Sequence, residues 1–270
     1  MIVRCAKHAS TLVLVAVLLG CATVPVTGRR QLVLISTSEI ETLGSEQYRE
    51  ILKQSKLSAD QVQVDRVRVI GRRIAQASEE YLREKGRGAE ANSFSWEFNL
   101  IQDDKTVNAF CLPGGKVAVY TGILALTRDD AGLATVIAHE VAHALAQHGS
   151  ERMSQMLLAQ FGSALLQQAL TNSTQKTREF LTLAYGVGAN VGVVLPYSRL
   201  HEKEADYIGL MLMARAGYEP EAAVAFWERM AQNGAGRAPE FLSTHPAPAT
   251  RIQALRDELP AARAEYRPQP

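Results

Sequence analysis

The chain has 270 residues, of which 47% are hydrophobic and 21% charged, and its 29 Lys and Arg nearly balance its 28 Asp and Glu. This length can bury a core that folds without disulfides or oligomerisation. The mixed alphabet, with 19 Gly and 10 Pro, excludes collagen-like, coiled-coil and disordered classes. Because no excess of basic charge is present, we expect neither nucleic acid nor a nucleotide as a partner.

The first twenty residues predict a signal peptide. They carry Arg4 and Lys7, no acidic residue, and an almost wholly apolar run over 11–19. A helix over that run rises only about 14 Å, whereas a bilayer core is about 30 Å thick, so a permanent membrane span is the weaker interpretation. Leu18-Leu19-Gly20-Cys21 resembles the bacterial lipobox, which implies that the Cys21 sulfur carries diacylglycerol.

Lipidation of Cys21 would hold the protein on a membrane, because each buried CH2 of an acyl chain contributes about 0.8 kcal/mol. Ala22 follows Cys21 where an Asp could stand, which by resemblance to Gram-negative lipoproteins implies the periplasmic face of the outer membrane in the cell envelope. The alternative is a plain secretory peptide with an incidental cysteine. We expect Cys111, in an apolar strand, to be a small core residue.

The rest of the chain predicts an α+β, mostly helical fold with a small antiparallel sheet. A polar tether over 22–30 comes first, and the capping box Ser58-x-x-Gln61 opens the second helix. A similar signature, Thr127-x-x-Asp130, opens a helix over 127–149. Helices are predicted over 38–54, 59–84, 127–149, 150–170, 199–216, 220–232 and 248–258, and strands over 94–101 and, in two runs, 109–120. The uncharged stretch 180–196 predicts burial against the core or over a cleft, with a second membrane anchor as the weaker alternative.

The sharpest motif is His139-Glu140-Val141-Ala142-His143, an H-E-x-x-H inside a helical pattern. At about 100° per residue, His139 and His143 lie about 40° apart on one face, so both imidazoles can reach one cation. Glu140 lies beside them and can approach a metal-bound water without binding the metal. This pattern predicts a zinc site with Glu140 as the catalytic base.

A catalytic zinc site needs a third protein ligand and an open position for water. Glu202 and Asp206 are four residues apart and share a helical face, whereas Glu204 points elsewhere. We predict that Glu202 binds the metal and that Asp206 accepts a hydrogen bond from a ligating histidine ring. Two solvated surface acids are the alternative explanation of the Glu202 and Asp206 pair.

Two other histidines compete with Glu202 as the third ligand. His148 lies about 180° around the helix from His139 if that helix continues, so we expect it to be structural. His201 is adjacent to Glu202 and is the weaker candidate. The residue that would stabilise the oxyanion is not assigned; the candidates are Tyr197, Arg199 and His245.

The sequence resembles the zinc metallopeptidases that include the HtpX heat-shock protease, the CAAX prenyl protease and the bacterial lipoproteins BepA and LoiP. The matching segments are 108–115, 139–143, 198–206, 244–246 and Arg251. The resemblance implies a gluzincin-like fold in which His139, His143 and Glu202 bind one Zn²⁺ per chain. Without the transmembrane helices of HtpX or the helical-repeat domain of BepA, the chain most resembles the short lipoprotein type.

Two further sites are proposed, the first from the resemblance and the second from the strand pattern. His245 matches a histidine that can take the open zinc position in a resting enzyme, as a fourth ligand or switch; the alternative is a loop histidine that stabilises its own Thr-His-Pro turn. The strand containing Asn108, Ala109 and Phe110 could offer an edge on which a substrate backbone pairs, or could be sheet core only.

These features divide the chain into a lipoprotein signal peptide (1–20), a lipidated tether and N-terminal helix (21–57), a zinc metallopeptidase domain (58–259) and a loose tail (260–270). The expected function is a lipid-anchored endopeptidase that hydrolyses misfolded or misassembled envelope proteins by Glu140-assisted attack of zinc-bound water. The competing hypothesis is a lipid-anchored periplasmic chaperone or outer-membrane assembly factor with a latent zinc site.

Overall fold

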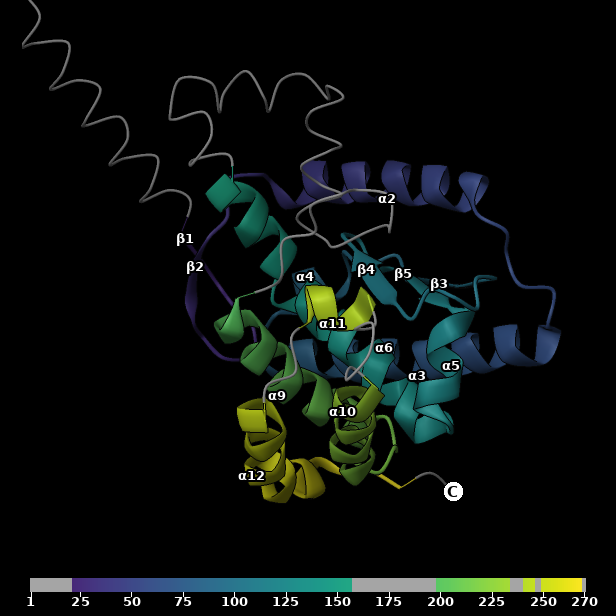
Figure 1. Cartoon of the computed structure of the whole chain (residues 1–270). Helices are drawn as coiled ribbons and strands as arrows, with labels where there is room; N and C mark the ends of the chain where they lie inside the picture. The colour runs from purple at the N-terminus through teal and green to yellow at the C-terminus, as the bar shows by residue number, and fades with distance from the viewer. Residues whose placement is uncertain (1–20, 157–197, 234–239, 246–248, 269–270) are drawn as a thin grey trace, which may run out of the picture.

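The computed structural model describes residues 21–156, 198–233, 240–245 and 249–268 (Figure 1). The predicted signal peptide and the apolar stretch 180–196 lie outside these ranges. A helical stretch covers 148–156. The named elements are β1 (Cys21–Thr23), β2 (Arg30–Leu32), α2 (Thr37–Gln54), α3 (Gln61–Glu84), α4 (Gly88–Ala91), β3 (Glu97–Ile101), β4 (Ala109–Leu112), β5 (Lys116–Tyr120), α5 (Thr121–Thr127), α6 (Asp130–Leu145), α9 (Arg199–Arg215), α10 (Glu221–Asn233), α11 (Glu240–Thr244) and α12 (Ala249–Glu265). The expected α+β, mostly helical fold is confirmed. Within the described ranges, every helix is too short or too polar to cross a bilayer.

The main sheet has the order β3-β5-β4, and it is mixed. β4 and β5 form an antiparallel hairpin around Gly114 and Gly115, both of which have positive φ. β5 then inserts beside β3 and runs parallel to it. The predicted wholly antiparallel sheet is therefore wrong for this pair, because the segment after β3 reverses the chain before β4 begins.

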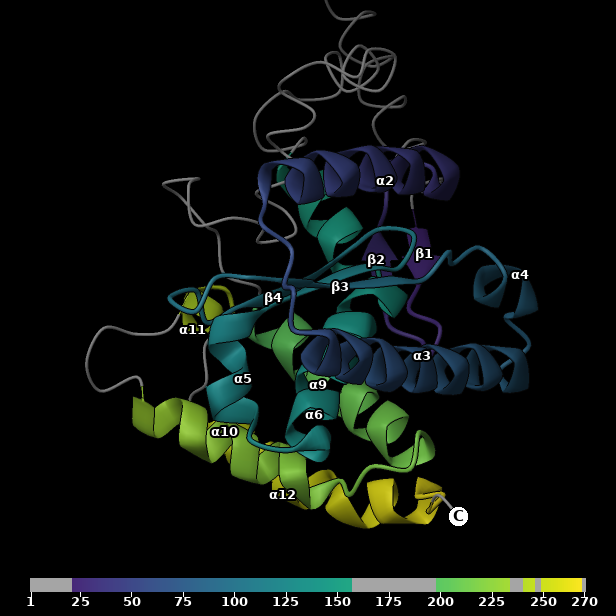
Figure 2. The ribbon, with the colours of Figure 1, turned by 90° about the vertical axis from the view of Figure 1, so that its right-hand side faces the viewer.

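Helices cover both faces of this sheet (Figure 2). Phe110 and Leu112 of β4 belong to the apolar cluster that contains the buried side chains of α2. Ala109 and Cys111 point the other way, into the larger core formed with α3, α6 and α9. A sheet covered on both faces has buried side chains on both sides, which explains why every residue of β4 and β5 is buried. Cys111 is a core residue, as expected.

Helix α6 lies at the centre of the larger core, and all of its residues from Gly132 to Leu145 are buried. Helix α9 crosses it closely, because Gly209 has no side chain at the contact. A Cβ built on Gly209 would lie 3.1 Å from the backbone nitrogen of His139. This close crossing fixes where the side chains of α9 meet those of α6.

The segment predicted as one helix over 127–149 is divided into three. α5 ends at Thr127, and Asp129 caps α6 by accepting a hydrogen bond from the backbone N–H of Gly132 at 2.8 Å. The predicted capping role of Thr127 is therefore wrong. α6 ends at Leu145, and Gln147, with a φ of 55°, turns the chain into the helical stretch 148–156.

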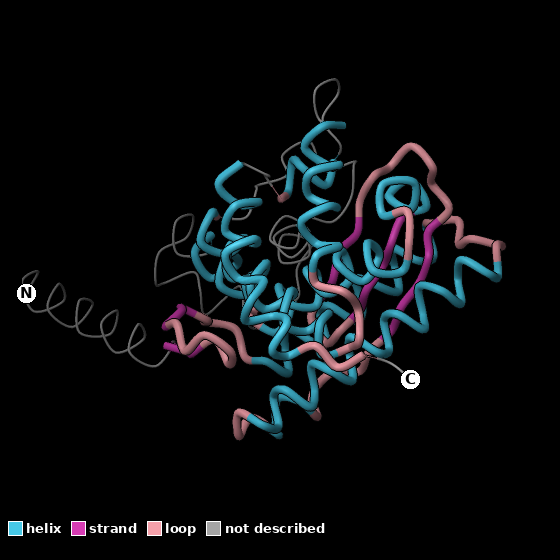
Figure 3. The backbone as a smooth tube through the Cα atoms, turned by 90° about the horizontal axis from the view of Figure 1, so that it is seen from below, coloured by secondary structure: helices cyan, strands magenta, loops and turns pink. Residues whose placement is uncertain are grey.

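Both ends of the described chain are more ordered than the sequence predicted. The segment expected to be a tether folds as a β1–β2 hairpin, separate from the main sheet (Figure 3), and its Val24 packs into the core. The tail expected to be loose from residue 260 continues α12 to Glu265. Leu255 and Ala262 are buried, and their apolar contacts offset the hydrogen bond that Pro260 cannot donate.

Candidate metal centre

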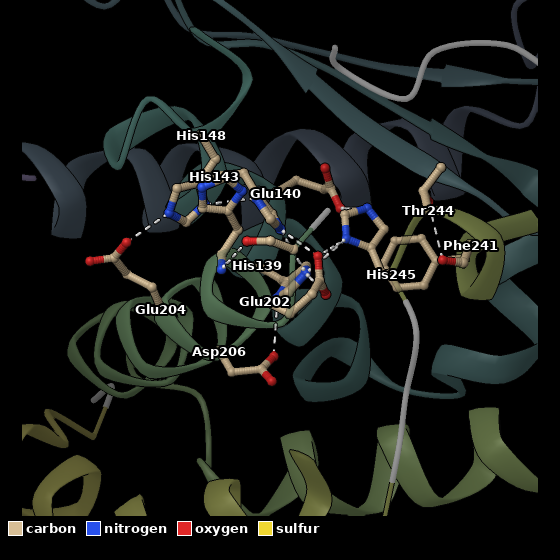
Figure 4. Close-up of polar contacts among 12 residues, drawn as sticks. His139, Glu140, His143, His148, Glu202, Glu204, Asp206, Phe241, Thr244 and His245 are labelled. Carbon is tan, nitrogen blue, oxygen red and sulfur yellow. Dashed lines mark hydrogen bonds and ion pairs between the residues drawn. The ribbon is translucent and has the colours of Figure 1, made fainter. Parts of the chain in front are cut away.

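Three segments contribute the candidate site residues (Figure 4). His139, Glu140 and His143 lie on α6, Glu202 lies in the first turn of α9, and His245 directly follows α11. All five residues are buried, with 2–4% of their surface exposed. Beyond its first turn α6 is apolar except for Thr135 and these three residues, so His139, Glu140 and His143 mark the candidate site.

The spacing of the candidate ligand atoms fits a metal ion. His139 Nε2 lies 3.1 Å from His143 Nε2. Glu202 presents Oε2 at 3.5 Å from His139 Nε2 and Oε1 at 3.4 Å from His143 Nε2. Two atoms that bind zinc tetrahedrally at about 2.1 Å lie about 3.4 Å apart. These three residues, which we call the triangle, therefore present donor pairs at the spacing of a tetrahedral zinc site, with one oxygen of Glu202 facing each histidine.

His245 brings a fourth donor to the same place, and one ligand atom from each of the four residues lies within 4.8 Å of the others. His245 Nδ1 is 3.2 Å from His139 Nε2 and 3.0 Å from Glu202 Oε1, and its Nε2 is 3.4 Å from Glu140 Oε1. The His245 ring also packs against Phe241, whose carbonyl accepts its backbone N–H. The ring thus stands between the three-residue triangle and the predicted base.

The carboxylates of the site are held by a buried arginine whose contacts sequence reasoning missed. Asp206 Oδ1 lies 3.2 Å from His139 Nδ1, the position predicted for it. Arg251 forms ion pairs with Glu202 at 2.6 Å and with Asp206 through both its Nε and Nη2 atoms, and its guanidinium stacks on Trp227. Arg251 comes from α12, so no local pattern around 139–143 or 202–206 could have indicated it.

The buried carboxylates of the site favour positive charge beside them, and they outweigh the effect of burial. Burial alone would lower the pKa of His139, but hydrogen bonds to Asp206 and Glu202 outweigh it and raise that pKa to about 9. Burial would raise the pKa of Glu202, yet Arg251 and the neighbouring histidines hold it well below its usual value. The Glu202 carboxylate is therefore ionised. Burial raises the pKa of Glu140, as suits a group that must accept a proton.

His148 and His201 lie outside the four-residue cluster. His148 does not face away from His143, because α6 ends before it; its Nδ1 lies 2.9 Å from His143 Nδ1. Its Nε2 bonds to Glu204 at 2.9 Å. His201 instead pairs with Glu151 at 3.0 Å. Gln147, just before His148, has a positive φ and bends the chain so that His148 faces His143. No pattern in the sequence predicts this bend.

The strand proposed for substrate pairing lies at an edge of the sheet, since β4 pairs only with β5 among the described strands. Asn108, Ala109 and Phe110 are buried. Asn108 donates a hydrogen bond to Glu240 at 3.2 Å, and the backbone N–H of Phe241 donates to the Val107 carbonyl. Helix α11, which precedes His245, is thus seated against the start of this strand. Of the oxyanion candidates, Arg199 is exposed and Tyr197 lies outside the described residues.

Comparison with known proteins accords with this geometry. Residues 71–259 match peptidase family M48. The mitochondrial metalloendopeptidase OMA1 of Schizosaccharomyces pombe is 42% identical over 176 residues, which are 64% of this chain and 50% of that protein. OMA1 of Saccharomyces cerevisiae is 34% identical, over 90% of this chain and 70% of that protein. The beta-barrel assembly-enhancing protease of Yersinia pestis is 34% identical, over 63% of this chain and 36% of that protein.

This chain therefore spans half or less of the length of most of these relatives. The family match covers most of the chain and includes α6 and α9, which carry His139, His143 and Glu202. The buried group of three histidines and one glutamate can hold one metal ion. The chain belongs to peptidase family M48, whose cofactor is zinc.

Proposed function

We propose that this chain is a zinc-dependent endopeptidase with His139, His143 and Glu202 as the metal ligands and Glu140 as the catalytic base. One observation carries the proposal: two buried histidine nitrogens and a buried carboxylate, whose donor atoms lie 3.1–3.5 Å apart, with a buried glutamate next to His139 in the sequence. The relatives named as metalloendopeptidases and proteases support the same reaction class.

The residues divide the work as follows. A zinc ion held by the triangle would supply a Lewis acid that polarises the scissile carbonyl and acidifies water. Glu140 Oε1, which makes no hydrogen bond to another described residue, accepts a proton from the attacking water and passes it to the leaving amine. Asp206 accepts the Nδ1–H of His139, which leaves Nε2 of that ring to face the metal.

His245 makes the arrangement seen here a resting one. Its ring occupies the space between the triangle and Glu140, where water and the substrate carbonyl must enter. We propose that it serves as a fourth ligand and withdraws when substrate binds along the β4 edge at Asn108, Ala109 and Phe110. The same position of His245 supports the second candidate function, a chaperone or assembly factor with a latent zinc site.

We further propose that Cys21 carries lipid and that the substrates are misfolded or misassembled envelope proteins. The lipobox-like Leu18-Leu19-Gly20-Cys21 supports the anchor. The Yersinia relative, named for assisting β-barrel assembly, supports a location at the periplasmic face of the outer membrane. Replacement of Cys21 by Ser should release the protein from the membrane fraction; retention there would refute the anchor.

The variant Glu140→Gln tests the enzyme hypothesis, because it removes the base while keeping the side-chain shape. It should bind about one zinc per chain and lose cleavage of unfolded casein by at least about a hundredfold. Glu50→Gln, the same change on the exposed face of α2, is the matched control and should cleave normally. Undiminished cleavage by Glu140→Gln would remove the assigned base. Chaperone activity retained by Glu140→Gln would support the second function.

A further inference from the structure

One arginine of the β1–β2 hairpin, Arg29, pairs with two buried carboxylates near the candidate metal centre. Arg29 binds Glu151 through two nitrogens, at 2.7 and 3.1 Å, and binds Glu204 through Nε at 2.8 Å. Thr27 of the same hairpin donates a hydrogen bond to the other oxygen of Glu204. Both carboxylates are almost fully buried, with 9% and 5% of their side chains exposed. Arg29 itself is partly buried, with 19% of its side chain exposed. A bidentate arginine between buried carboxylates holds its partners in a defined geometry.

Glu204 is the start of a hydrogen-bonded chain that ends at a metal ligand. Its Oε2 lies 2.9 Å from His148 Nε2, and His148 Nδ1 lies 2.9 Å from His143 Nδ1. His143 Nε2 is the atom that faces Glu202 and His139. The four groups therefore form one line, from the guanidinium of Arg29 through Glu204 and His148 to His143.

The direction of these hydrogen bonds follows from the ionised carboxylate of Glu204 at one end and leads to the protonation of His143 at the other. A carboxylate that already accepts from Arg29 and Thr27 is ionised and can only accept, so His148 must donate from Nε2. Neutral His148 then has a lone pair on Nδ1 and accepts the Nδ1–H of His143. His143 keeps its own lone pair on Nε2, the form that a metal requires.

We propose that His148 and Glu204, held in place by Arg29 of the N-terminal hairpin, are positioning residues that fix the orientation and tautomer of His143 for zinc binding. The inference rests on the proposed ligand role of His143. It gives each of the two histidines of α6 its own carboxylate: Asp206 supports His139 directly, and Glu204 supports His143 through His148. The segment that directly follows Cys21 is then a structural part of the metal centre.

The zinc affinity of the full-length chain, measured by competition with a chelating indicator at neutral pH, tests the proposal. His148→Ala and Glu204→Ala should each weaken zinc binding by about 10- to 100-fold while still binding one zinc at saturation. Arg29→Ala should weaken it less, and Arg29→Lys should recover part of the loss. His148→Gln should also recover part of it, because an amide can donate to Glu204 and accept from His143.

Lys203→Ala is the matched control. Lys203 lies beside Glu204 on α9 but is exposed, and its variant should bind zinc as the parent does. The unfolding midpoint of each metal-free variant separates general destabilisation from a local effect. A purely structural role of Arg29, Glu204 or His148 would lower that midpoint and leave the zinc affinity of the folded protein unchanged, which would overturn the proposal.

A double variant tests whether Arg29 affects zinc binding only through the hydrogen bonds that run from Glu204 through His148 to His143. Arg29→Ala should cause no further loss of zinc affinity in the His148→Ala background, because its effect passes through His148. Additive losses of zinc affinity would show that Arg29 does not act through His148 and would refute this path. Zinc affinity is measured independently of peptide cleavage. Failure of the parent protein to cleave casein would therefore refute the endopeptidase proposal. The proposal about His148, Glu204 and Arg29 would still be decided by the zinc affinities of the variants.

Discussion

Arg251 offers the most quantitative test of how the metal centre is held together. Its side chain is 4% exposed and contacts the carboxylates of Glu202 and Asp206, which are 4% and 7% exposed. Replacement by Met keeps most of the volume and the contact with Trp227 but leaves two buried carboxylates without their arginine. Removing one partner from a buried ion pair costs about 3–5 kcal/mol.

We therefore expect Arg251→Met to lower the free energy of unfolding of the metal-free protein by about 3–5 kcal/mol. For a chain of this size, each kcal/mol corresponds to about 2–4 °C, so the unfolding midpoint should fall by about 6–20 °C. With zinc bound, the loss should be smaller, because the cation supplies countercharge to Glu202. Circular dichroism melts in chelator and in excess zinc measure both values.

Arg256→Met is the control on the same helix. Arg256 pairs with Glu228, but both side chains are at least 40% exposed, so the pair is screened by water and its loss should cost less than about 1 kcal/mol. Equal losses from the two substitutions would refute the argument that burial sets the cost. A larger loss for Arg251→Met in zinc than in chelator would refute the argument about countercharge.

Three further predictions follow from particular contacts. Gly209→Val should destabilise the fold by about 1–3 kcal/mol and weaken zinc binding, because a side chain there forces α9 away from α6 at His139; an unchanged unfolding midpoint would contradict this contact. Hydrogen bonds from His201 and Arg29 outweigh burial and hold the pKa of Glu151 at about 2, against 4.5 for a free side chain. Its ionised form therefore stabilises the fold above about pH 4.5, and this contribution is lost as the pH falls toward 2. The difference in midpoint between the parent and Glu151→Gln should accordingly shrink between pH 5 and pH 3, and a constant difference would argue against it. His245→Ala should raise casein cleavage about tenfold, as expected if the open conformation is a minor state of about 10%; a fall in cleavage would identify His245 as a catalytic group instead.

The sequence by itself determined the parts of this protein that depend on local periodicity. The H-E-x-x-H spacing places two imidazoles on one face of α6, and the spacing of Glu202 and Asp206 places both acids on one face of α9. These relations hold in any helix, whatever surrounds it. The mostly helical fold, the strands around Gly114 and the core position of Cys111 could be predicted on the same grounds.

Only the tertiary structure decided which of these faces meet. The crossing of α6 and α9 at Gly209 brings Glu202 to the two histidines, and the end of α6 before His148 turns that residue toward His143. Arg251 and Arg29 reach the site from opposite ends of the chain. No local pattern encodes such contacts, because they depend on where a helix stops and how closely its neighbour can pack. For the same reason the sequence predicts a tether where the structure has the β1–β2 hairpin, because the partners of its Arg29, Glu151 and Glu204, lie far along the chain.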